Sequence, residues 1–335
     1  MFSIILIPLV LGMFLSMNMG ASGIAPSFAA AYSVESIRKD LFPGLFGIFV
    51  FIGAVVAGKK VMVTLGKDIL PNDIITITTT SVLLLSIGLT MFLSNLLKIP
   101  QSTSQATVFA LVGVGMYYNI FPGKKLFIEI IPTWLILPIV TFLLTYIIGK
   151  WIYPLVKNIK VKNNTWNRSI LIGTSCYVAF SIGSNNVANA ASPLAYMVFN
   201  ECQLQAGVNT ELTLMIIMTL MMAPCFGIGS SLLGYGNLET TGKKITELGE
   251  FGATLVSFLT ASLLLFASLS KGIPTSLVQM NVAAILAWGI SQNGWKITCN
   301  SRSVKKMILV WSLSPLLACF LAYLCMYIAD IVFLQ

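Results

Sequence analysis

The sequence contains no histidine and few charged residues. Asp, Glu, Lys and Arg together account for 9% of its 335 residues, whereas hydrophobic residues account for 57%. Soluble domains carry about 25% charged residues, so this composition excludes a soluble protein and indicates one that is embedded in a membrane.

The eleven acidic residues fall in predicted loops or near the ends of apolar segments. A hydrolase or transferase needs an acid, a base or an activated nucleophile, and a metal site needs convergent His, Cys or carboxylate ligands. The six cysteines have no paired spacing, which argues against a disulfide framework. We therefore expect no enzyme, no metal site and no cofactor.

Apolar runs occupy most of the chain. Ten of them are interpreted as segments that cross a hydrocarbon core of about 30 Å: residues 2–19, 44–63, 74–97, 105–121, 127–149, 169–182, 212–233, 247–270, 275–291 and 307–333. Backbone groups in lipid must be satisfied internally, and these runs are too long and continuous for barrel strands. The prediction is an all-α polytopic membrane protein. Because the first run lacks a basic leader and a cleavage site, it is expected to be retained.

The basic residues predict the orientation. The stretch 150–168 holds five Lys and Arg residues and no acidic residue, which is typical of a cytoplasmic segment. Counting ten crossings from this stretch places both termini outside. The net charge of +9 is therefore attributed to loops that orient the protein in the cytoplasmic membrane, and not to a nucleic-acid partner.

Four landmarks occur twice in the same order. They are Gly20-Ala21-Ser22-Gly23 with Gly183-Ser184-Asn185-Asn186, residues 64–67 with 240–243, residues 99–105 with 273–279, and Trp134 before Pro138 with Trp311 before Pro315. With five crossings per half, an odd number, the second copy enters the membrane from the opposite side, so the repeat is inverted. If some segments are half-helices or re-entrant hairpins, the crossings must be counted again. We predict a first repeat over 1–150, a basic cytoplasmic linker over 151–168 and a second repeat over 169–335. Duplicated halves with broken helices are typical of secondary transporters, whose substrate site lies where the breaks meet.

The first copy of the repeated motif places Gly20, Gly23 and Pro26 inside an apolar segment, where a straight helix avoids such residues. We expect the backbone to open there and to present N–H groups to an anion. The alternative is a face of small residues that lets two helices approach closely.

The second copy places three carboxamides, Asn185, Asn186 and Asn189, within an apolar helix, with Ser192 just beyond. Amides at membrane depth are costly unless they bond one another, a partner helix or a substrate. We interpret these asparagines as site residues and Ser192 as a possible supporting residue.

Each half also has a proline followed by hydroxyl residues at the start of an apolar run. These are Pro100 with Ser102, Thr103 and Ser104, and Pro274 with Thr275 and Ser276; Gln105 and Gln279 follow as possible supporting residues. A helix start with free N–H groups and hydroxyls makes an anion pocket. Helix capping alone explains one such cluster, but explains two at equivalent positions less well.

Lysines lie at or beyond several segment ends, among them Lys59, Lys60, Lys67, Lys243 and Lys244. Contact with lipid headgroups is the default interpretation for such lysines. The functional alternative is that they gather an anion at each mouth of the protein.

At these motifs the chain resembles the inorganic phosphate transporter (PiT) family, which carries Gly-Ala-Asn-Asp-Val-Ala-Asn-Ala in each half and a Pro-Val-Ser-Thr-Thr-like motif later. Residues 183–190 match the first signature in all but two positions, and 99–104 and 272–276 resemble the second. The resemblance spans nearly the whole chain and implies cation-coupled uptake of an oxyanion, with H⁺ or Na⁺ as the coupling ion. The site residues it implies are Ser22, Gly23, Ser102, Thr103, Ser104, Asn185, Asn186, Asn189, Thr275 and Ser276.

Two departures bear on the substrate. The signature aspartate is Gly23 in the first copy and Asn186 in the second. Carboxylates are natural ligands of hard cations, so their loss argues against sodium coupling. Hydrogen phosphate has a proton to donate to a carboxylate. Sulfate carries no proton at neutral pH, so a carboxylate would repel it.

The first copy also resembles the CysP-type sulfate permeases, a branch of this family. We therefore predict a symporter that takes up sulfate by alternating access. A phosphate:cation symporter is the alternative, and an anion channel is less favoured. The expected partners are the oxyanion and the lipid bilayer; a homodimer is left open.

Overall fold

The structure is a computed structural model that describes residues 2–33, 38–99, 101–156, 164–204, 208–244, 248–299 and 302–333. Within these ranges every regular element is helical. The first half contains α1 (Phe2–Ser33), α2 (Phe42–Ala57), α3 (Lys59–Val63), α4 (Ile77–Leu96), α5 (Thr103–Tyr117), α6 (Ile131–Ile147) and α7 (Tyr153–Val156). The second half contains α8 (Asn164–Asn186), α9 (Ala188–Glu201), α10 (Val208–Lys244), α11 (Gly249–Ser270), α12 (Leu277–Asn293), α13 (Trp295–Cys299) and α14 (Arg302–Phe333).

Seven segments of the described chain are long and apolar enough to cross a membrane. They are Ile5–Ala29, Lys39–Ala57, Ile77–Leu96, Leu126–Leu155, Asn209–Glu239, Gly249–Ser270 and Leu309–Val332. Many large apolar side chains on these helices are exposed, as expected for surfaces that face lipid. The prediction of an all-α polytopic membrane protein is confirmed.

The two halves have the same order of helices, and equivalent helices of the two halves make equivalent contacts with the other half. Helix α1 packs against α10, and α8 packs against α2; likewise α5 packs against α14, and α12 packs against α6. Glycines bring the first two pairs together: a Cβ on Gly20 would lie 2.0 Å from the carbonyl oxygen of Phe226, and one on Gly183 would lie 2.1 Å from that of Val50. The matching contacts agree with two repeats of one fold.

The expected opening of the backbone between Gly20 and Pro26 is wrong, because α1 continues through both residues. Pro26 lacks the N–H that would bond the carbonyl of Ser22, and the Ser27 hydroxyl donates to the Gly23 carbonyl at 3.1 Å, one turn back. Gly20 serves the close packing that the sequence offered as the alternative. In the second copy the helix is interrupted for one residue, Val187, between α8 and α9.

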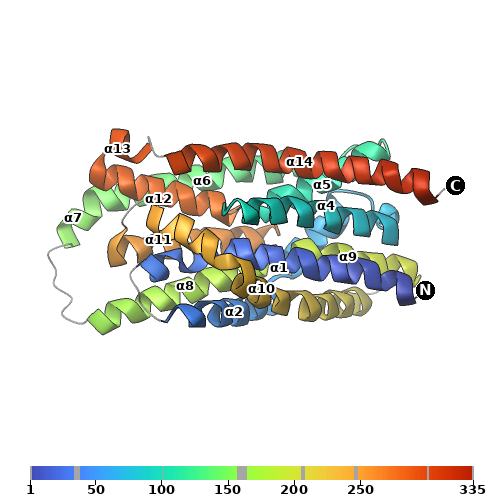
Figure 1. Cartoon of the computed structure of the whole chain (residues 1–335), viewed down its shortest axis with the longest axis horizontal. Helices are drawn as coiled ribbons and strands as arrows, with labels where there is room; N and C mark the ends of the chain where they lie inside the picture. Colours follow the sequence, from blue (N-terminus) through green and yellow to red (C-terminus); the bar gives the residue numbers. More distant parts are fainter. Residues whose placement is uncertain are drawn as a thin grey trace.

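Helices α4 and α5 form one hairpin, and α11 and α12 form another, with tips that meet near the middle of the bundle (Figure 1). A Cβ on Gly252, near the start of α11, would lie 2.4 Å from the Trp288 ring, near the end of α12. Gly123, after α5, donates its N–H to the carbonyl of Ile69, before α4, at 2.9 Å. The bases of the two hairpins lie at opposite ends of the bundle, that of α4–α5 toward the two termini and that of α11–α12 toward α7 (Figure 1).

The assignment of residues 105–121 and 275–291 as full crossings is wrong. Helices α5 and α12 have 15 and 17 residues, at or below the lower limit of about 17 for a crossing, and neither is among the seven segments. The predicted crossing over 169–182, which lies in α8, is not among them either. Helices α4 and α11 are by length and composition among the seven segments that could cross. If each pair, α4–α5 and α11–α12, enters and leaves on the same side, each half loses two crossings, so the predicted odd number per half and the inverted repeat are kept.

Helix α1 begins and α14 ends at one end of the bundle, and α7 lies at the other (Figure 1). This arrangement agrees with two termini on the same side. The side itself and the boundaries 1–150, 151–168 and 169–335 stay predictions; residues 157–163 of the linker lie outside the described residues.

Candidate anion site

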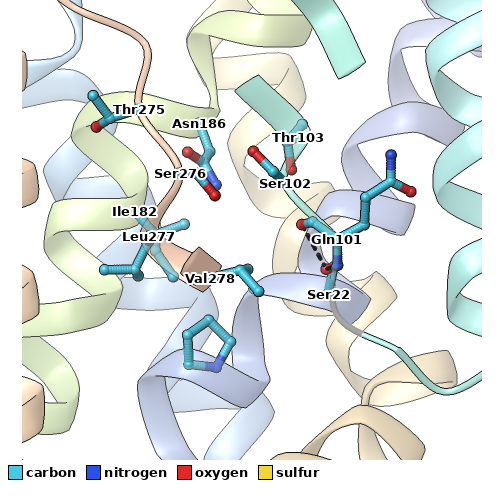
Figure 2. A pocket seen from close by; sticks show the side chains of 12 residues that line it. Ser22, Gln101, Ser102, Thr103, Ile182, Asn186, Thr275, Ser276, Leu277 and Val278 are labelled. Atoms are coloured by element: carbon cyan, nitrogen blue, oxygen red, sulfur yellow. Dashed lines mark hydrogen bonds between the residues drawn. The ribbon is translucent and has the colours of Figure 1, made fainter. Parts of the chain in front are cut away.

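A pocket lies where the tips of the two hairpins meet α1 and α8 (Figure 2). Its free volume is about 10 Å³, so in this conformation it is a narrow cavity with room for about one water molecule. The residues that line it are Ser22, Gly23, Pro26, Gln101, Ser102, Thr103, Ile182, Asn186, Thr275, Ser276, Leu277 and Val278. None of these described residues carries a charged side chain.

Helices α5 and α12 both begin at this pocket. Ser102 caps α5 by accepting the N–H of Gln105 at 3.3 Å, and Ser276 caps α12 by accepting the N–H of Gln279 at 3.3 Å. The first N–H groups of each helix have no carbonyl partner in their own helix, and the helix dipole adds partial positive charge there. Each serine keeps its hydroxyl hydrogen to donate. Two helix starts thus present hydrogen-bond donors to one pocket.

Ser22 and Asn185 occupy equivalent places in the two repeats and hold the two hairpin tips. Ser22 Oγ accepts the N–H of Gln101 at 2.9 Å, and Asn185 Oδ1 accepts the N–H of Thr275 at 3.1 Å. Asn185 Nδ2 donates to the carbonyl of Ile273 at 3.0 Å. Asn185 is fully buried and is not among the lining residues; its amide holds Thr275 in place, and its predicted contact with the anion stays a prediction.

Three further predicted residues, Ser104, Asn189 and Ser192, are not among those that line the pocket. Ser104 Oγ donates to Asn185 Oδ1 at 3.3 Å, Asn189 Nδ2 donates to the carbonyl of Asn186 at 2.9 Å, and Ser192 Oγ donates to the carbonyl of Met62 at 2.6 Å. These contacts hold the surrounding helices together, and a direct role for these residues at the anion stays a prediction.

Asn186 and Thr275 line the pocket and have buried polar atoms without a partner. Among the described residues, neither Asn186 Oδ1 nor Thr275 Oγ1 has a hydrogen bond. A buried polar group left unpaired costs about 1–3 kcal/mol, so a bound ligand would satisfy these groups. The Asn186 amide carries both a donor and an acceptor, and rotation about its Cβ–Cγ bond exchanges them.

Gln105 and Gln279 lie one turn beyond the pocket and bond each other, with Nε2-to-Oε1 distances of 3.2 and 3.0 Å. They join the first turns of α5 and α12 and do not line the pocket.

Gln101 lines the pocket but was missing from the residues predicted to bind the anion. Its side-chain Oε1 accepts from Ser94 Oγ at 2.5 Å, and its amide lies away from Asn186 and Ser276 (Figure 2). The repeated motif could have indicated it, because Gln101 is equivalent to Thr275. The apolar walls, Pro26, Ile182, Leu277 and Val278, have no comparable signal in the sequence.

Gly23 leaves no free space for a larger residue. A Cβ at this position would lie 3.1 Å from Phe46 Cζ and 3.6 Å from Ile182 Cδ1. The fully buried Phe46 ring fills the volume that a side chain at position 23 would need. The pocket is therefore built from hydroxyls, an amide and backbone N–H groups, which together suit an anion.

Comparison with known proteins gives concordant matches. Residues 19–169, and separately residues 153–322, match the model of the phosphate transporter family. The chain is 34% identical to the sulfate permease CysP of Bacillus subtilis, over 93% of this chain and 84% of that protein. It is 24% identical to a putative phosphate permease of Thermococcus kodakarensis, over 96% of each.

One solved structure, described as the sodium-dependent phosphate transporter, matches with a TM-score of 0.85 and 21% identity, over 98% of this chain and 100% of that chain. At this identity the match demonstrates a shared fold.

Proposed function

Because the chain belongs to the phosphate transporter family, we propose that it is a secondary active transporter that takes up sulfate. The family model and the relatives agree in indicating a membrane permease for an inorganic anion. The observation that carries the choice of sulfate is the pocket itself, whose lining contains donors and no carboxylate.

The chemistry of the pocket supports sulfate. Sulfate has no proton at neutral pH and only accepts hydrogen bonds. Ser102, Ser276 and the first N–H groups of α5 and α12 offer donors, and nothing charged in the lining repels a dianion. The relative named a sulfate permease supports the same substrate.

Phosphate is the alternative, and one observation favours it. Asn186 Oδ1 is a buried acceptor without a partner, and hydrogen phosphate has a hydroxyl that would donate to it, whereas sulfate has none. The similar solved structure is described as a phosphate transporter.

The transport cycle that we propose is alternating access, because the substrate pocket lies where two inverted repeats meet. Uptake is coupled to a cation, H⁺ or Na⁺, across the cytoplasmic membrane, with both termini outside. An anion channel is less favoured; its flux would not respond to an opposing cation gradient.

Uptake of labelled sulfate and labelled phosphate into liposomes, under imposed proton or sodium gradients, tests these proposals. We expect concentrative sulfate uptake that one of the two gradients drives. Phosphate uptake with sulfate inert would overturn the preferred substrate, and uptake that neither gradient changes would overturn symport by these ions.

A further inference from the structure

The side chain of Lys60 reaches from the first repeat to the hairpin tip of the second. Its Nζ donates to the carbonyl oxygens of Leu269 at 2.6 Å and Ser270 at 3.3 Å. These two residues end α11, where carbonyls have no partner within the helix and the helix dipole is negative. A lysine ammonium group at this place stabilises the helix end. The contact therefore differs from the lipid contact that the sequence predicts by default for Lys59 and Lys60.

The backbones also meet at this point. Gly272 has a φ of +65°, in the left-handed region that favours glycine. A Cβ on Gly272 would lie 2.5 Å from the carbonyl oxygen of Lys60. The chain after α11 is thus pressed against the backbone of α3, and the ammonium contact of the exposed Lys60 lies at the edge of this junction between the repeats.

This junction leads directly into the pocket. The Pro274 carbonyl accepts from Trp134 Nε1, also of the first repeat, at 2.8 Å. The next two residues, Thr275 and Ser276, line the pocket. A shift of Leu269 or Ser270 therefore moves the cap of α12 and the donors that face the anion.

At the tip of the other hairpin, asparagines make hydrogen bonds between the helices. Asn237 Nδ2 donates to Asn95 Oδ1 at 2.9 Å, and Asn95 Nδ2 donates to the Asn18 carbonyl at 3.0 Å. The place equivalent to Lys60 is occupied by Gly236, where a Cβ would lie 3.0 Å from Lys98 Cγ. The lysine and the glycine have exchanged places between the two junctions: Lys98 packs against Gly236, as Lys60 packs against Gly272.

We propose that Lys60 is a positioning residue: its ammonium group holds residues 269–276 so that Thr275 and Ser276 face the substrate. The inference rests on the proposed function for its effect on transport. The clasp between Lys60 and the tip of the α11–α12 hairpin does not depend on which anion is carried.

Three variants test the clasp. Lys60→Met keeps an unbranched side chain and removes the charge and the hydrogen-bond donors. Lys60→Arg keeps the charge and the donors. Lys59→Met neutralises the adjacent exposed lysine and is the matched control. Hydrogen exchange of the full-length protein reports on residues 269–276. We expect exchange about twofold to fivefold faster in Lys60→Met, as for loss of a solvent-exposed charged contact, and wild-type exchange in the other two.

The same variants are then compared in liposomes. We expect the KM of anion uptake to rise about twofold to fivefold in Lys60→Met, with Vmax changed less than KM, and recovery in Lys60→Arg. If Lys60→Met does not fold, Gly272→Ala perturbs the same junction from the other side and should give the same two changes.

Unchanged exchange at 269–276 would overturn the clasp, and so would equal effects of Lys59→Met and Lys60→Met. Faster exchange with an unchanged KM would overturn the positioning role. If the wild-type protein moves neither sulfate nor phosphate, the proposed function fails, while the exchange data still decide whether Lys60 holds the tip.

Discussion

The side chains of Gln105 and Gln279 form a reciprocal amide pair, in which each Nε2 donates to the other's Oε1 at 3.2 and 3.0 Å. Each glutamine is also the third residue of its helix, and its N–H bonds the serine cap at the pocket. The pair therefore ties together the two helix starts that line the pocket, one from each repeat.

The first prediction concerns this pair. Gln105→Leu leaves the Gln279 amide without its partner, which costs about 1–3 kcal/mol of the free energy of unfolding. The double variant with Gln279→Leu should cost less than the sum of the single variants, because no unpaired amide remains. A double-mutant cycle on thermal unfolding in detergent measures this coupling, and additive effects would show that the amides do not interact.

The second prediction concerns the charge of the pocket. Asn186→Asp places a carboxylate in the lining and should weaken sulfate uptake at least about tenfold through repulsion between like charges. Asn186→Ser removes the amide without adding charge and should have the smaller effect. Kinetics of labelled uptake compare the two variants; unchanged sulfate transport by Asn186→Asp would place that side chain away from the anion.

The third prediction concerns the helix caps. Ser102→Ala and Ser276→Ala should each lower the free energy of unfolding by about 1 kcal/mol and raise the KM for the anion about fivefold through one lost donor. Thr76→Ala removes the cap of α4, which accepts the N–H of Thr79 outside the pocket. This control should lower the melting temperature and leave the KM unchanged. Equal KM effects of all three variants would contradict a direct role of the two serines.

The fourth prediction concerns the close contact between α8 and α2. Gly183→Ala forces a Cβ to within 2.1 Å of the Val50 carbonyl oxygen, so the backbones must separate at a cost of at least about 2 kcal/mol. Gly173→Ala, on the same helix, meets no atom within 4 Å and should leave the melting temperature unchanged or slightly raised. Similar melting temperatures for the two variants would contradict the packing described for Gly183.

The fifth prediction concerns pH. No titratable side chain lines the described pocket, so the Kd for sulfate should change less than about twofold between about pH 6 and pH 8. Asn186→Asp should introduce a dependence with a defined sign: binding strengthens as falling pH protonates the new carboxyl group and removes its negative charge. Equilibrium binding to the detergent-solubilised protein measures both. A strong pH dependence in the wild-type protein would indicate a titrating group at the anion.

The starts of α5 and α12 could be predicted from the sequence because a helix cap is a local event. A hydroxyl residue, its φ and ψ angles and the N–H three residues later suffice to define it. The sequence indicated capping by a hydroxyl residue after each proline, and the structure shows that Ser102 and Ser276 are the caps. The same local logic failed at Gly20 and Pro26, because whether a glycine opens a helix or lets another helix approach depends on what packs beside it.

The sequence by itself determined that the chain is an all-α membrane protein with a duplicated motif, because hydropathy and repetition are properties of the order of residues. Only the tertiary structure decided which polar residues face the pocket. Asn185 and Asn186 are adjacent in the sequence, yet Asn185 bonds the hairpin tip and Asn186 lines the pocket. The rotation of the helix and the partners supplied by distant segments give such neighbours different roles. The contacts of Lys60 with α11 likewise depend on a distant segment. No local pattern contains that information.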